Sequence, residues 1–138
     1  IELAARKAKA WPKSCVLILL DCEDFCAAQL GPKLLERALS CRSDVTFLVV
    51  LAHREYETWF LAAAESLRGV CGLPTNLCAP RNAESIRDAK GWLGGQMPVP
   101  YNEPEHQPKM TGAFNFEQAM ETKSFHRAYQ KIKAFFCK

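Results

Sequence analysis

The sequence lacks several patterns that identify common classes of protein. It contains no Cys-x-x-Cys pair and its three histidines are scattered, so the grouped ligands of a zinc site are missing. Its apolar runs, such as Val16–Leu20, are far too short to cross a bilayer, and no signal peptide is visible. It has no Gly-rich phosphate loop, because Gly94-Gly95 lacks the required spacing and context. We therefore expect a cytoplasmic protein that acts without a membrane.

A strong excess of one charge is also absent. The 138 residues include 18 basic and 15 acidic side chains, and this net charge of +3 is too small to indicate nucleic-acid binding by itself. The seven cysteines are an odd number, which suits reduced thiols better than a disulfide framework. Apolar residues make up 49% of the chain, enough to bury a core. Length and composition predict a single domain over residues 1–138.

Two continuous apolar runs predict the strands of a parallel sheet. Cys15–Leu20 is apolar throughout, and Val45–Leu51 is mostly apolar and rich in β-branched residues, so we expect both strands to be buried by helices on both faces. Helical composition and spacing predict helices over residues 1–10, 24–39, 53–68, 82–93, 115–120 and 125–136. The alternation of strand and helix indicates an α/β fold with a Rossmann-like parallel sheet flanked by helices.

Several breaks are expected in the helical pattern. Gly31-Pro32 interrupts the second predicted helix, and Gly94-Gly95 ends the fourth. Residues 69–82 are expected to form a loop. Met97–Lys109 contains four prolines and is expected to hold no regular structure. The second half of the chain is thus predicted to be a less regular, helical region.

Acidic side chains follow both predicted strands. Asp21, Glu23 and Asp24 come after the first strand, and Glu55 and Glu57 come after the second. The carboxyl ends of parallel strands share one edge of a sheet, where ligands bind in open α/β folds. Residues i and i+2 of an extended chain point to one side, so Asp21 and Glu23 are expected to face a single ion. Carboxylate oxygens suit Mg²⁺. Alternatively, these acids only favour the positive ends of the helices that follow.

An aromatic stripe in the third predicted helix has two interpretations. Tyr56, Trp59 and Phe60 could stack on nucleic-acid bases. Their helical spacing favours core packing instead.

Three blocks of sequence carry a resemblance to a known family. They are VLILLDCED at residues 16–24, AHREYETWFL at residues 52–61 and AESIRDAK at residues 83–90. Matching positions continue through Tyr101, Gln107, Lys109 and Ser124-Phe125. On these residues the chain resembles the uncharacterised prokaryotic domain-of-unknown-function family 4276, which is considered related to Toprim domains.

The resemblance implies a Toprim-like Mg²⁺ site. Toprim domains place one Glu after an early strand and an Asp-x-Asp pair after a later one. Asp21 and Glu23 fall on that pair, with Glu in place of the second Asp, and Asp24 lies next to them as a further metal ligand. The early strand is expected to precede residue 1, so the resemblance implies that an N-terminal strand is missing from this chain.

The same resemblance implies a Mg²⁺-dependent phosphodiesterase or nuclease, or a nucleotidyl-transfer relative, acting on nucleic acid or a nucleotide. In this hypothesis Glu55 and Glu57 supply a further ligand or a base that positions water, and Lys90 holds phosphate oxygens. The alternative is a non-catalytic interaction module, or a fragment of a larger protein. There the acids are structural, and the Pro-rich segment at residues 97–109 docks a protein partner. A nucleotide-binding regulator is a third interpretation, which the missing phosphate loop disfavours.

Overall fold

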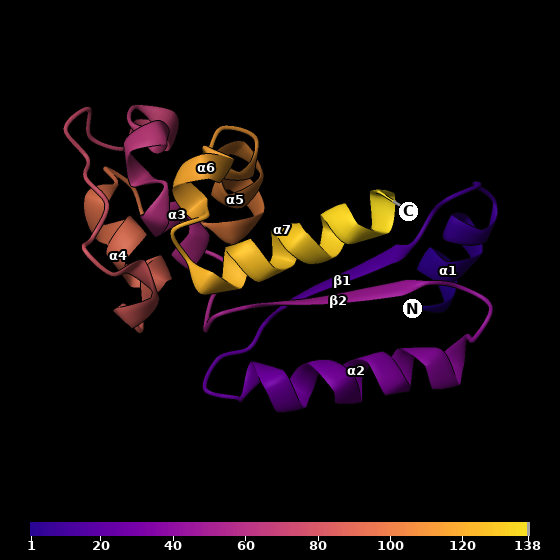
Figure 1. Ribbon diagram of the computed structural model, residues 1–138. Helices are drawn as coiled ribbons and strands as arrows, with labels where there is room; N and C mark the ends of the chain where they lie inside the picture. The colour runs from indigo at the N-terminus through magenta and orange to yellow at the C-terminus, as the bar shows by residue number, and fades with distance from the viewer. Residues whose placement is uncertain (138) are drawn as a thin grey trace.

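Helices pack around a small parallel sheet in the computed structural model, which describes residues 1–137 (Figure 1). The helices and strands are α1 (Glu2–Lys9), β1 (Val16–Asp21), α2 (Ala27–Cys41), β2 (Phe47–Ala52), α3 (Thr58–Ala62), α4 (Ala89–Gln96), α5 (Glu103–Thr111), α6 (Phe116–Ala119) and α7 (Lys123–Phe136). Short 3₁₀ helices lie between α3 and α4, at Ala64–Leu67, Val70–Gly72 and Ala83–Ser85. The mixed α/β class predicted from the sequence is confirmed.

The sheet of the described chain consists of β1 and β2, paired in parallel. The register aligns Val16 with Phe47 and Asp21 with Ala52. Pairing continues past the strands, because the backbone N–H of Cys22 donates to the carbonyl of Ala52 at 3.0 Å. Both strands therefore end at the same edge, as the parallel arrangement requires.

The expectation that β1 is buried on both faces is wrong. Leu17, Leu19 and Leu20 are 45%, 38% and 43% exposed. Within residues 1–137, β1 pairs only with β2, and helices α2 and α7 pack chiefly against β2. The prediction holds better for β2, whose Val49 and Val50 are buried.

The helices that flank the strands depart from the prediction at their breaks. Helix α2 continues through Gly31-Pro32, because one lost N–H···O bond does not outweigh the packing of the helix against β2. Helix α3 begins at Thr58 rather than at His53. The intervening loop contains Arg54 in the left-handed region, with φ of +59°, which a continuous helix excludes.

The second half of the chain is more regular than predicted. Helix α4 begins at Ala89 rather than at Asn82, and Asp88 caps it by accepting a bond from the backbone N–H of Gly91. The helix includes Gly94-Gly95 instead of ending there. Helix α5 forms inside the Pro-rich segment, where Asn102 caps its start. Pro104 lies in the first turn, where a missing N–H costs no intrahelical bond. The two last predicted helices are confirmed as α6 and α7.

The core has two parts. The larger is built by the end of β2, by α3 to α7 and by the 3₁₀ helices. It includes Trp59 and Phe60, so the core interpretation of the aromatic stripe is confirmed for these two residues. The smaller joins α1, α2 and the starts of both strands through Ala5, Val16 and Ala38. All seven cysteines are free thiols.

No helix among residues 1–137 is both long enough and apolar enough to span a membrane.

Candidate functional site

The predicted site residues lie where the strands of the sheet end. Helices α3 to α6 gather beyond this end of the sheet (Figure 1). Asp21 is the last residue of β1, and Glu55 and Glu57 lie in the loop between β2 and α3. Lys90 is in the first turn of α4, and Glu103 is the first residue of α5. Segments far apart in sequence thus contribute to one edge.

Lys90 is held among carboxylates from several of these segments. Its Nζ lies 2.8 Å from Glu103 Oε1 and 3.7 Å from Asp21 Oδ2. The other oxygen of Asp21, Oδ1, accepts the backbone N–H of Tyr56 at 2.7 Å. The hydrogen bond with Glu103 is the chief cause of the raised pKa of Lys90, and the charges of Glu57 and Asp21 raise this pKa further against the effect of burial. The ammonium form is therefore favoured.

Glu57 is a fully buried carboxylate. Its Oε1 accepts hydrogen bonds from the hydroxyl of Tyr101 at 2.7 Å and from Nε2 of Gln107 at 3.0 Å. Its Oε2 is buried without a hydrogen-bond partner in the described part of the chain. A buried charge is costly unless it is paired, so the environment of Oε2 distinguishes Glu57 from the other acids of the site.

Tyr101 is kept in its donating form at this site. Burial is the main cause of the raised pKa of its hydroxyl, and the hydrogen bond to Glu57 and the charge of Glu57 raise it further. The phenol consequently stays protonated and continues to donate to the carboxylate. A cavity of about 720 Å³ lies beside Lys90 and is lined also by Tyr101 and Glu103. Asp21 and Glu57 are not among its lining residues.

Glu55 accepts a hydrogen bond from the backbone, whereas Glu57 accepts its bonds from side chains. Oε2 of Glu55 accepts the backbone N–H of Lys90 at 2.9 Å. This bond ties the loop after β2 to the first turn of α4, where backbone N–H groups lack intrahelical partners. Glu55 therefore helps to hold the backbone of Lys90 in place.

The structure separates two predicted ligands from this cluster. The chain turns directly after β1, where Glu23 has a φ of +46° and the N–H of Phe25 bonds to the carbonyl of Cys22. The expectation that Asp21 and Glu23 leave the strand in extended geometry is therefore wrong. Asp24 is exposed and pairs with Arg87 at 2.8 Å. The structure thus brings together Asp21, Glu55, Glu57 and Lys90. Glu23 and Asp24 are exposed and take no part in the contacts of this cluster.

Sequence reasoning missed three members of the site. Tyr101 and Gln107 matched the family, but no role followed from the match. Glu103 lies in the segment that its prolines marked as irregular. Asn102 followed three residues later by Glu105 is a capping signal, and it would have placed a helix start here.

Within residues 1–137, no group of three or more His, Cys, Asp or Glu residues is arranged to hold a metal ion. Mg²⁺ commonly takes only one or two carboxylates and completes its shell with water and phosphate oxygens. The cluster contains the carboxylates of Asp21 and Glu57, and Oε2 of Glu57 has no hydrogen-bond partner within residues 1–137. Three carboxylates, those of Glu103, Asp21 and Glu57, act on the single ammonium of Lys90, so negative charge is in excess.

Comparison with family models, with curated proteins and with solved structures finds no match for this chain.

Proposed function

We propose that the chain is a Toprim-like domain that binds a divalent cation such as Mg²⁺ through Asp21 and Glu57 and acts on phosphodiesters, as a nuclease or a nucleotidyl-transfer enzyme. The observation that carries this proposal is the buried oxygen Oε2 of Glu57, which has no partner among the described residues. It belongs to a cluster in which carboxylates outnumber the ammonium of Lys90. A divalent cation would offset this excess of negative charge and pair with the buried oxygen.

The surrounding residues divide the work of such a site. A bound Mg²⁺ would offset phosphate charge and lower the pKa of a water molecule. Tyr101 and Gln107 fix the orientation of the Glu57 carboxylate through their bonds to Oε1. Lys90 lines the cavity and can donate to phosphate oxygens that enter it, as lysines do in phosphoryl-transfer sites. Glu55 holds the backbone of Lys90 in place.

Titration calorimetry with Mg²⁺ and with Mn²⁺ tests the ligand set. We expect the wild-type protein to bind the ion, and Asp21→Asn and Glu57→Gln each to weaken binding by more than about tenfold, because each removes a ligand charge at almost constant shape. Asp24→Asn is the matched control, since it makes the same chemical change at an exposed carboxylate outside the cluster. An absent ion signal in the wild type, or an equal loss in Asp24→Asn, would contradict the proposal.

A cleavage assay separates ion binding from chemistry. Labelled single-stranded and double-stranded DNA and RNA are incubated with the protein and Mn²⁺. Lys90→Met is expected to slow cleavage while ion binding is kept or tightened, because the variant removes a phosphate contact and also a cation that competes for Asp21. Cleavage that persists at the wild-type rate in Asp21→Asn would show that another site, or a contaminant, is responsible.

A further inference from the structure

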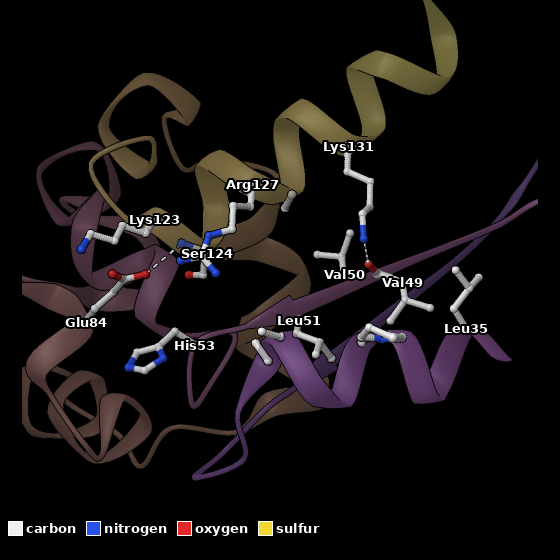
Figure 2. A pocket seen from close by; sticks show the side chains of 15 residues that line it. Leu35, Val49, Val50, Leu51, His53, Glu84, Lys123, Ser124, Arg127 and Lys131 are labelled. Carbon is white, nitrogen blue, oxygen red and sulfur yellow. Dashed lines mark hydrogen bonds between the residues drawn. The ribbon is translucent and has the colours of Figure 1, made fainter. Parts of the chain in front are cut away.

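A second cavity, of about 650 Å³, lies on the opposite side of β2 from β1 (Figure 2). Residues of α2 form one wall and residues of α7 form the other, with Val49 and Leu51 of β2 between them. None of the residues that carry the proposed phosphodiester site lines this cavity. It is therefore independent of that site.

The edge of β2 in this cavity carries backbone groups that no strand uses. The carbonyl of Thr46 accepts the N–H of Val16 and the carbonyl of Ala52 accepts the N–H of Cys22, so the even-numbered positions face β1. Successive residues of a strand direct their N–H and C=O groups to opposite edges. Val49 and Leu51 therefore direct theirs into the cavity, and within residues 1–137 no strand pairs with this edge.

Lys131 makes one contact to this edge. Figure 2 shows its side chain reaching from α7 to the carbonyl oxygen of Val49, which accepts the hydrogen bond from Nζ at 2.8 Å. A lysine head on a strand carbonyl is a contact that a backbone N–H of an added strand can replace. The ammonium released in that way would then be free to pair with an acid.

The α7 wall carries a row of positive charge. Lys123, Arg127 and Lys131 are spaced one helical turn apart and exposed, and none forms an ion pair with another described residue. Four residues of helix rise about 6 Å. Side chains on one face of an extended strand repeat about every 6.6 Å. Acids at alternate positions of an extended chain therefore match this row.

The α2 wall has the opposite character. It presents Ala28, Pro32 and Leu35 to the cavity. A strand added to β2 alternates its side chains between the two walls, so one set would meet apolar groups and the other would meet cations. Glu84 lies at the end near Lys123, where its Oε1 accepts the backbone N–H of Ser124, and it limits the acidic row at that end.

We propose that this groove binds an extended peptide segment of a partner protein, with acidic and apolar side chains in alternation, as an added strand on β2. Strand addition supplies affinity through main-chain hydrogen bonds, and the walls supply specificity. The observations favour a polypeptide over a nucleic acid, because a phosphate backbone has no N–H to donate to the strand carbonyls. The apolar α2 wall also provides no hydrogen-bond donor or positive charge for a phosphate backbone.

Fluorescence anisotropy with a labelled peptide of repeated Glu-Val units is the test. The matched peptide has the same composition, with its Glu residues in one block and its Val residues in another. We expect the alternating peptide to bind more tightly than the block peptide, and N-methylation of its alternate amides to weaken it. Equal binding of the alternating and block peptides would overturn the proposal. So would tighter binding of a single-stranded oligonucleotide to the same groove.

Variants of α7 locate the binding surface. Arg127→Glu with Lys131→Glu is expected to weaken peptide binding by more than about tenfold through like-charge repulsion. Lys133→Glu is the matched control, because Lys133 is an exposed residue of the same helix and does not line the groove. Arg127→Ala provides a milder variant whose helix content is checked by circular dichroism. Peptide binding unaffected by both groove variants would refute the assignment, whereas Asp21→Asn should leave it unchanged.

Discussion

Residues 1–52, the sheet half, and residues 53–137, the helical half, are held together differently. Nearly all of the large, fully buried side chains lie in the helical half, among them Phe60, Leu93 and Met110. In the sheet half, Leu17 and Leu39 are more than two-fifths exposed, at 45% and 41%. The sheet half, which has the clearest sequence pattern, therefore has fewer large, fully buried side chains than the helical half, whose pattern is irregular. A regular apolar pattern identifies an element, but burial depends on how many other elements cover it.

The largest expected effect comes from the centre of the helical half. Phe60 is fully buried, and its ring packs edge-on against Tyr56 at 5.2 Å and Phe114 at 5.5 Å. Phe60→Ala should lower the free energy of unfolding by about 3–5 kcal/mol. Leu39→Ala in α2 is the control for the sheet half, and it should cost less than about 1 kcal/mol. Urea unfolding measures both, and equal losses would break the comparison.

An intermediate effect is expected at the buried carboxylate of the helical half. Tyr101→Phe removes a donor from Glu57 and should lower the free energy of unfolding near neutral pH by about 1–3 kcal/mol. Tyr129→Phe, which changes an exposed tyrosine of α7, is the control and should have little effect.

The pH dependence sharpens this test. The pKa of Tyr101 is raised in the folded protein, chiefly by burial, whereas the unfolded chain releases the phenolic proton from about pH 10. The stabilisation is therefore fully present below about pH 10, and it is lost as pH rises further. The raised pKa of Lys90, caused chiefly by Glu103, acts in the same direction. Urea midpoints across this range should fall less steeply in Tyr101→Phe, and parallel curves would contradict this account.

The smallest effect is expected within the sheet half, where surface ion pairs attach α1 to Arg42 and Asp44. Arg42 lies 2.9 Å from Glu2 and 2.8 Å from Asp44. Hydrogen bonds from Arg42 first, and then from Lys9, lower the pKa of Asp44, so this stabilisation is present above about pH 4 and is lost on acidification. Arg42→Gln should loosen α1 with little change in the global melting temperature.

Hydrogen exchange in α1 measures this loosening. The difference from wild type should fade in about 1 M NaCl, where the screening length is about 3 Å. Arg37→Gln, an exposed change in α2 without an ion pair in the described chain, is the control. A loss of protection that spreads through the helical half would contradict the prediction that these ion pairs stabilise only α1.

The sequence allowed the strands and the terminal helices to be predicted, because their patterns are local. It also placed Asp21, Glu55 and Glu57 at one edge, because parallel strands end together. The exposure of Leu17 could not be predicted from the apolar run that contains it, since the run does not show how many helices or strands pack beside it. Prolines in α5 concealed a helix, because Pro104 occupies a first turn where it is tolerated.

The remaining errors at the site have specific causes. The left-handed residue Glu23 redirects the chain after β1, and a non-glycine residue gives little warning of that conformation. Glu103 reaches Lys90 through the placement of α5, which depends on packing between distant segments. No local pattern contains that information.

The outer edge of β1 has a consequence for the behaviour of concentrated solutions. Among residues 1–137, no strand pairs with β1 on that side, and β1 exposes Leu17 and Leu19 beside unpaired backbone groups. Such an edge is a template for aggregation, because strands from other molecules can add to it and extend into fibrils. Lys13 and Asp21 flank the run as charged gatekeepers, and they oppose this growth at the two ends of the strand.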